Sequence, residues 1–193
     1  MALSEDGQLI SQIRQGNTLA LKALYEKYKV QVYRTALAIT CNREAAEDIL
    51  QDCFLKVYTH ADKLDSSLPL SPWLHRVAVN LSYNWLNRNR RWLQPLEEVI
   101  DQLIMPHRTS PEAAFEMREL QQVVQDAIAS LPFAHRVVVV LFYLNGFSLN
   151  EIAYILDCPV GTVKSRLHYA RQSLSRKLER ARQLSPEIAY EFA

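Results

Sequence analysis

The sequence predicts an all-α protein with two small helical bundles joined by a flexible linker, the second bundle being a helix-turn-helix domain without a wing. Only four glycines occur among the 193 residues, and no segment shows the apolar–polar alternation of a strand. Apolar residues instead recur at three- and four-residue spacing almost throughout, which is the period of one helix face. With 49% hydrophobic residues, the chain can bury a core in each bundle.

The first bundle is expected to span residues 1–93 and to contain four helices. Gly16 suits the end of a short first helix and Asn17 the start of the second, because glycine adopts C-cap conformations and asparagine accepts hydrogen bonds from free N–H groups. Asn42 is predicted to cap the third helix in the same way. Ser71 is the predicted N-cap of a long fourth helix that ends near residue 91.

Residues 94–109 are predicted to be the linker, because they hold two prolines and no sustained helical period. The second bundle then occupies residues 110–193. Its helices are expected to break at Pro132 and again at a turn formed by Asn145 and Gly146, with two further helices after that turn.

Charge is distributed unevenly although the net charge is only +1. Residues 71–93 carry four basic and no acidic side chains, and residues 160–183 carry seven basic and one acidic. Between these segments, residues 94–126 carry seven acidic and two basic side chains. Two basic segments separated by an acidic one indicate two contact points on a polyanion.

The cysteines argue against a disulfide framework and against a metal site. Cys41, Cys53 and Cys158 lie far apart and outside any CxxC or Cys/His pattern, so we interpret them as buried thiols. No cofactor is predicted. The first residues lack the basic start and apolar stretch of a signal peptide, and no run of eighteen apolar residues occurs, so the expected location is the cytoplasm without membrane insertion.

Residues 148–174, SLNEIAYILDCPVGTVKSRLHYARQSL, have the layout of a helix-turn-helix. Gly161 and Thr162, at the start of the second helix, are placed for a phosphate to meet free backbone N–H groups. A projection at 100° per residue predicts an outward face suited to the major groove: Lys164, Ser165, His168, Tyr169, Gln172 and Arg176. The alternative is an ordinary helical hairpin with a solvated basic face.

The fourth helix of the first bundle carries a second outward stripe. Its members are Arg76, Asn80, Tyr83, Asn87 and Arg90, flanked by Trp73, Asn84, Arg88 and Arg91. Cations for phosphates, amides for base edges and an aromatic ring for stacking are what unpaired DNA requires. The alternative for the tryptophans, including Trp85 on the inward side, is that they fill the core.

Leu55 is predicted to point away from the apolar stripe of the third helix. It lies among polar outward positions of the same helix, Glu44, Glu47, Asp48, Gln51 and Asp52. An apolar spot with an acidic rim fits a protein-binding patch. The alternative is an isolated exposed leucine, which needs no explanation.

With these features in place, the chain resembles the extracytoplasmic-function (ECF) sigma factors, a group of the bacterial housekeeping-type sigma family, over nearly its full length. The resembling segments are AAEDILQDCFLKVY, PWLHRVAVNLSYNWLNRNRR, SPEAAFEMRELQQVVQDAIASLP and FSLNEIAYILDCPVGTVKSRLHYAR. The resemblance implies a non-enzymatic protein that directs RNA polymerase to promoters, with sigma region 2 in residues 1–93 and sigma region 4 in residues 110–193.

The resemblance also implies roles for single residues. The positions where the family docks on the polymerase are Asp48, Gln51, Asp52, Phe54, Leu55 and Lys56, whose apolar members alternatively belong to the core. The −10 element would be melted and read by a loop and by the helix that follows it, with one base flipped into a pocket under the loop. The loop residues are Lys63, Asp65, Ser66 and Ser67. The helix residues are Arg76, Asn80, Tyr83, Asn84, Asn87, Arg90 and Arg91. The −35 reader would be Gly161, Thr162, Lys164, Ser165, Arg166, His168, Tyr169 and Arg171.

Tyr169 departs from the family pattern, in which arginine is frequent, so a familiar −35 sequence is not transferred to this chain. The implied partners are core RNA polymerase, promoter DNA and an anti-sigma factor. The acidic linker would run through the RNA exit path of the polymerase.

Two other function classes stay open at this point. A helix-turn-helix regulator could bind duplex DNA without joining the polymerase, with the first bundle as a sensor or dimerisation module. A hydrolase would need an arrangement such as HExxH, a nucleophile elbow or a phosphate loop, and none of these occurs in the sequence.

Overall fold

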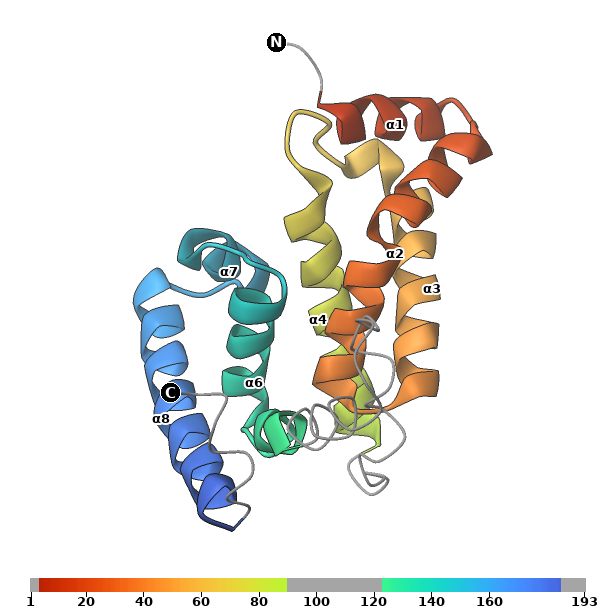
Figure 1. The fold of residues 1–193 in the computed structure, drawn as a ribbon. Helices are drawn as coiled ribbons and strands as arrows, with labels where there is room; N and C mark the ends of the chain where they lie inside the picture. The colour runs from red at the N-terminus through yellow and green to blue at the C-terminus, as the bar shows by residue number, and fades with distance from the viewer. Residues whose placement is uncertain (1–3, 90–122, 185–193) are drawn as a thin grey trace, which may run out of the picture.

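The computed structural model describes residues 4–89 and 123–184, and every regular element in these two ranges is helical (Figure 1). The first half contains α1 (Glu5–Arg14), α2 (Thr18–Thr40), α3 (Arg43–Thr59), the short 3-10 helix η1 (Ala61–Lys63) and α4 (Leu70–Arg88). The second half contains helical residues 123–129, α6 (Phe133–Val139), the π-helical turn η4 (Val140–Leu144), α7 (Leu149–Leu156) and α8 (Val160–Leu184). No described helix is both long and apolar enough to cross a membrane. The predicted linker lies outside the described residues.

Two of the predicted N-caps in the first half are confirmed. The Asn17 side chain accepts a hydrogen bond from the Leu19 N–H at 3.0 Å, and the Asn42 side chain accepts one from the Ala45 N–H at 2.8 Å. Gly16 has the left-handed φ of 84° that the predicted C-cap region requires.

The predicted N-cap Ser71 is wrong, because α4 begins at Leu70 and its flanking residue Pro69 makes no side-chain cap. The cap comes from α1 instead: the Asp6 carboxylate accepts a hydrogen bond from the Leu70 N–H at 3.2 Å. Pro72 lies in the first turn of α4, where its missing N–H leaves no intrahelical bond unmade.

The helix-turn-helix forms as predicted from local sequence. Ser148 and Glu151 make a reciprocal capping box at the start of α7. Asp157 closes α7 in the left-handed region with φ 51°, a conformation that aspartate tolerates better than most residues. The break at Pro132 and the turn at Gly146, with φ 71°, are also present.

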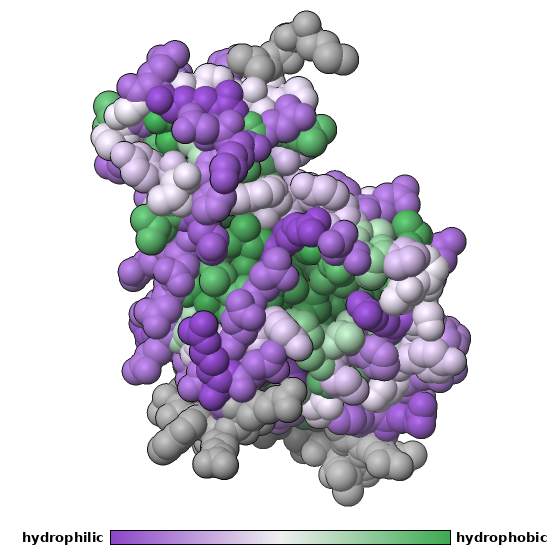
Figure 2. All heavy atoms as spheres, turned by 180° about the vertical axis from the view of Figure 1, so that it is seen from behind, coloured by the Kyte–Doolittle hydropathy of each residue, from purple (hydrophilic) through white to green (hydrophobic). Residues whose placement is uncertain are grey.

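The two halves pack against each other and share part of a core. Ile39 at the end of α2 and Val79 on α4 are buried in one cluster with second-half residues such as Val137 and Ile152. Arg136 on α6 adds a polar link by donating to the Ile39 carbonyl at 2.7 Å. In Figure 1, α4 lies between the other helices of the first half and the helices α6 and α7 of the second half. Figure 2 shows the opposite face, where apolar residues gather in the middle and hydrophilic residues lie at the margins.

A partly buried hydrogen-bond chain crosses the same interface. The Asn145 amide nitrogen lies 2.9 Å from the Thr35 hydroxyl and 2.9 Å from His75 Nε2. His75 Nδ1 lies 2.8 Å from the Ser71 carbonyl, and the imidazole contacts the Phe147 ring edge to face. Since the carbonyl only accepts, Nδ1 carries the proton and Nε2 accepts from Asn145. The network therefore requires a neutral imidazole.

Burial lowers the pKa of His75 below its ordinary value, outweighing the hydrogen bond to Ser71. The unfolded chain therefore binds a proton on His75 that the folded protein does not, and stability should be full above a pH of about 6.5 and decline as the pH falls below it. We expect acidification from about pH 7.5 to about pH 5.5 to lower the free energy of unfolding by about 1 kcal/mol. His75→Gln should reduce this loss in urea titrations at both pH values, and an equal loss in both proteins would contradict the assignment.

The prediction of three buried thiols is only partly correct. Cys53 is fully buried, and burial raises the pKa of its thiol to about 12, so it is inert at neutral pH. Cys41 and Cys158 are half-buried, because they lie at the ends of α2 and α7 and not on the inward face of a helix.

Candidate nucleic-acid and protein interfaces

The outward face of α8 presents most of the predicted groove-reading side chains to solvent. Lys164, Ser165, His168 and Tyr169 are exposed, while Val163 and Leu167 on the opposite side are buried. The Tyr169 ring is 56% exposed and packs against His168 edge to face at 5.5 Å between centroids. This face therefore offers a cation, hydroxyls and rings on a rigid helix, which suits contact with base edges and phosphates.

Other members of the predicted −35 set, Thr162, Arg166 and Arg171, make contacts that hold them against neighbouring segments of the protein. The Thr162 N–H donates to the Pro159 carbonyl at 2.9 Å, so it is not free to bind a phosphate. The expectation of a free N–H at Thr162 was wrong, because α8 begins earlier in the chain, at Val160. Arg166 is half-buried. Arg171 donates to the Tyr143 hydroxyl at 2.7 Å and lies over the Phe142 and Tyr143 rings, so its guanidinium points back toward η4.

Ser148→Ala is expected to lower the free energy of unfolding by about 1 kcal/mol, because it removes the hydroxyl half of the capping box that starts α7. Denaturant titration measures this loss. Asn150→Ala changes an exposed polar residue of the same helix and is the matched control. Equal midpoints for the two variants would contradict a stabilising cap.

The predicted single-strand stripe on α4 is present and solvent-facing over most of its described length. Asn80, Tyr83, Asn84 and Asn87 are exposed, and the Tyr83 ring packs against Phe133 at 5.1 Å between centroids. Trp73 and Trp85 are half-buried, and Trp73 packs on the first-half core, as the alternative reading anticipated. Arg90 and Arg91 lie outside the described residues.

Arg76 is the exception on this stripe, because α7 engages its guanidinium. Arg76 donates to the Tyr154 carbonyl at 3.1 Å and to the Asp157 carboxylate at 3.1 Å, and it lies 5.6 Å from the centre of the Tyr154 ring. Its side chain is 33% exposed, against 82% for Asp157. The helix-turn-helix thus covers one end of the stripe.

The loop between η1 and α4 borders a pocket of about 390 Å³. Its walls come from α1 through Ile10, from η1 through Lys63, from the loop through Leu68, from α4 through Trp73 and from α7 through Tyr154. This volume lies in the range of small-molecule pockets. Within the loop, Asp65 accepts hydrogen bonds from both the N–H and the hydroxyl of Ser67, which folds the loop into a compact turn.

The acidic face of α3 is exposed around Leu55, as predicted. Asp48, Gln51 and Asp52 face solvent and Leu55 is 59% exposed. Lys56 is half-buried.

Phe54, another of the predicted contacts, belongs to the core: it is 5% exposed and packs edge to face on Tyr25. Neighbouring residues of a helix point to different sides, so Phe54 can face the core while Leu55 faces solvent. Sequence reasoning missed Tyr58, which is 50% exposed and lies three residues after Leu55 on the same face. Helical spacing from Leu55 would have found it.

Comparisons with known proteins match both halves. The family model of sigma-70 region 2 matches residues 24–92, and that of sigma-70 region 4 matches residues 121–174. The chain is 33% identical over 176 residues to the ECF RNA polymerase sigma factor SigW of Bacillus subtilis, covering 88% of this chain and 94% of that protein. The chain belongs to the ECF sigma factors. This sigma factor is also 30% identical over 183 residues to the ECF RNA polymerase sigma-E factor of Escherichia coli K12, covering 90% and 94%.

Solved structures show the same fold. CnrH in complex with the cytosolic domain of CnrY matches this sigma factor with a TM-score of 0.69 at 23% identity, covering 91% of this chain and 98% of that one. RpoE from Bartonella quintana, in complex with the anti-sigma factor NepR, matches with a TM-score of 0.63 at 23% identity, covering 82% and 98%. By the two family models, the first half of this sigma factor carries region 2 and the second half carries region 4.

Proposed function

We propose that this sigma factor binds core RNA polymerase through the acidic face of α3, reads a melted −10 element with α4 and the loop before it, and reads a duplex −35 element with α8. The observation that carries the proposal is the separation of three exposed surfaces with different chemistry on one chain that belongs to the ECF family. No catalytic group takes part in this function.

The −10 assignment is supported by the composition and exposure of the α4 stripe. Asn80 and Asn84 provide amide donors and acceptors, and Tyr83 provides an exposed ring on which an unpaired base can stack. The pocket beside the loop provides space for a flipped base. Because α7 engages Arg76 and lines this pocket, contact of DNA with Arg76 or with the pocket requires α7 to move away from α4.

The −35 assignment is supported by the exposed face of α8, whose Lys164 and Ser165 lie in the first turns of the helix. Helix-turn-helix proteins insert the corresponding helix into the major groove with its N-terminal residues at the base edges. Arg166 and Arg171 join this surface only if they leave their contacts with Cys158 and the Tyr143 hydroxyl.

The proposed partners are core polymerase, promoter DNA and an anti-sigma factor. Relatives with this fold have been solved in complexes with the cytosolic domain of CnrY and with NepR. An acidic linker in residues 94–109 would follow the RNA exit path, and the domain limits 1–93 and 110–193 are proposed on the same basis. The cytoplasm, where core polymerase works, is the proposed location.

Run-off transcription tests the proposed function. Core polymerase from the source organism is incubated with and without this protein on fragments of that organism's upstream DNA. Start sites that depend on the protein and share −10 and −35 elements are the expected result. Tight binding to duplex DNA without any new start site would favour a regulator that acts without joining the polymerase.

A further inference from the structure

The N-terminal helix contacts the segment before α4 and the start of α4 at three points, and none of the proposed promoter contacts lies on that helix. We infer that α1 is a clamp that sets the conformation of residues 61–70, so that Asp6, Gly7 and Arg14 are positioning residues for −10 base selection. This inference rests on the proposed function of the loop. None of the three residues needs to touch DNA.

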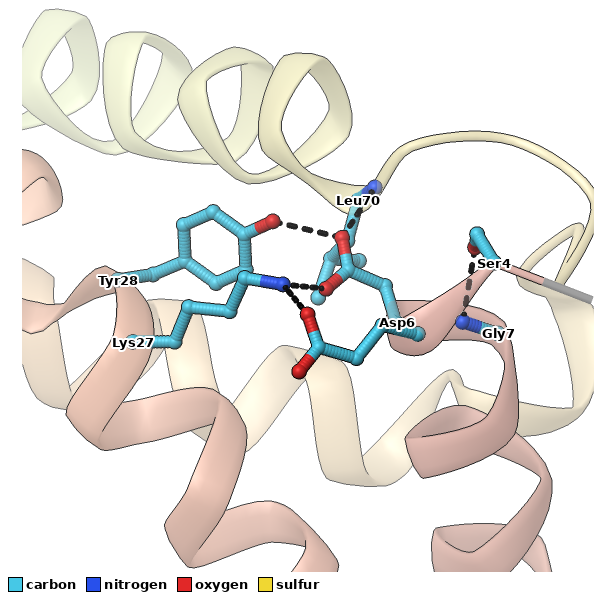
Figure 3. A network of polar contacts seen from close by, with 7 residues as sticks. Ser4, Asp6, Gly7, Lys27, Tyr28 and Leu70 are labelled. Atoms are coloured by element: carbon cyan, nitrogen blue, oxygen red, sulfur yellow. Dashed lines mark hydrogen bonds and ion pairs between the residues drawn. The ribbon is translucent and has the colours of Figure 1, made fainter.

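Asp6 fixes the far end of the loop, where α4 begins. One carboxylate oxygen accepts from the Tyr28 hydroxyl at 2.6 Å and from the Leu70 N–H at 3.2 Å, and the other accepts from the Lys27 ammonium at 2.8 Å (Figure 3). Asp6 is only 5% exposed. Burial alone would raise its pKa, but these hydrogen bonds lower the pKa of the Asp6 carboxyl below its ordinary value, so it stays charged. A buried carboxylate with three donors holds the start of α4 firmly against α1 and α2.

Arg14 fixes the near end, where η1 leads into the loop. Its Nε donates to the Ala61 carbonyl at 2.9 Å, and its Nη2 donates to the Leu64 carbonyl. The planar guanidinium reaches both carbonyls at once, which a lysine ammonium could not do in the same geometry. Because both acceptors are backbone atoms, Arg14 restrains the path of the chain directly.

At Gly7, helix α1 approaches the middle of the loop closely. A Cβ built on Gly7 would lie 2.0 Å from the Ser66 carbonyl oxygen and 3.0 Å from the Ser66 carbonyl carbon. The obstructing atoms are backbone, so no side-chain rotation relieves the overlap. Only glycine allows α1 to approach the loop this closely, and any larger residue must displace the segment that carries Asp65, Ser66 and Ser67.

These contacts differ from ordinary helix packing in their targets. Helices normally meet through apolar side chains, whereas here Asp6, Gly7 and Arg14 act on backbone atoms of the loop and of the first residue of α4. A segment that selects a base by fit must keep its backbone in place, because hydrogen bonds weaken steeply when the distance or angle between donor and acceptor changes. The clamp meets that need.

Gly7→Ala tests the clamp with promoters that the unchanged protein selects in the run-off experiment. Each position of the −10 element on the non-template strand is replaced in turn by the other three bases, and transcript yields give a base preference at each position. We expect the variant to lose about tenfold in preference at one or two adjacent positions, within the usual range for a single mismatched base. Preference at the remaining −10 positions and affinity for core polymerase should change less than twofold.

Arg14→Lys is the second variant, because it keeps the charge and leaves the glycine contact intact while losing one of the two carbonyl bonds. It should reduce preference at the same positions by a smaller factor. Gln8→Ala, an exposed neighbour on α1, is the matched control and should behave as the unchanged protein.

The outcomes separate the clamp from the proposed function. Equal loss of transcription on every template, with base preference retained in Gly7→Ala and Arg14→Lys, would show simple destabilisation and overturn the clamp. Silence of the unchanged protein with core polymerase would overturn the proposed function, and the clamp with it.

Discussion

Leu55→Asp is expected to weaken binding to core RNA polymerase about a hundredfold, while binding of a −35 duplex to α8 stays unchanged. Leu55 is 59% exposed at the centre of an acidic rim, so losing its side chain costs little stability. The substitution does place a carboxylate where the proposed interface is apolar. Central apolar anchors of an interface typically cost 2 kcal/mol or more when lost, which is roughly thirtyfold in affinity, and an unpaired buried charge adds to that. Fluorescence anisotropy of the labelled protein titrated with core polymerase measures the effect.

Asn80→Ala provides the opposite pattern. Asn80 is exposed on α4 and is not part of the proposed polymerase-binding face of α3, so the variant should bind core polymerase normally. It should lose promoter opening, measured by permanganate reactivity of thymines in the −10 region. Leu19→Asp is a control for adding a carboxylate at an exposed apolar position, since Leu19 is 73% exposed on α2 and outside the proposed interface. If Leu55→Asp and Asn80→Ala damaged both steps equally, the division of labour between α3 and α4 would be wrong.

Local features of the fold were predictable from sequence because their causes lie within a few residues. Asn17 and Asn42 cap the next helical turn as predicted, and the outward position of Leu55 follows from helical period alone. Phe54 follows the alternative that apolar members of the docking segment belong to the core, because the family pattern marks a segment and does not separate its inward from its outward side chains.

Contacts between distant segments were not predictable in this way. Asp6 caps a helix that begins 64 residues later, and no local pattern reveals that pairing. Likewise His75 and Val79 give α4 a second buried side that faces the second half, but apolar residues in a helix do not specify which element covers them. The contacts of α4 with α1 and with α7 could therefore be found only in the three-dimensional structure.

Val79→Asp is expected to separate the two halves without unfolding either of them. Val79 is 4% exposed and belongs to the shared cluster, not to the core that α1, α2, α3 and α4 form among themselves. An unpaired carboxylate at this position costs several kcal/mol while the halves stay together, and this cost disappears once the halves separate and the carboxylate reaches water. Small-angle X-ray scattering should give a radius of gyration several ångströms above the roughly 16 Å of a compact chain of this length, with helicity by circular dichroism unchanged.

Separation should also release Arg76 from Tyr154 and Asp157 and uncover the pocket beside the loop. Binding of a single-stranded oligonucleotide without polymerase should then strengthen about tenfold at low salt, even though the substitution adds a negative charge, because a freed arginine is worth more to a phosphate than one already paired. Asn80→Asp places the same charge one residue along on the exposed face and should leave the radius unchanged. A compact Val79→Asp protein with full helicity would mean that the contact between α4 and α7 does not depend on the shared core, and that Arg76 is held by its polar partners alone.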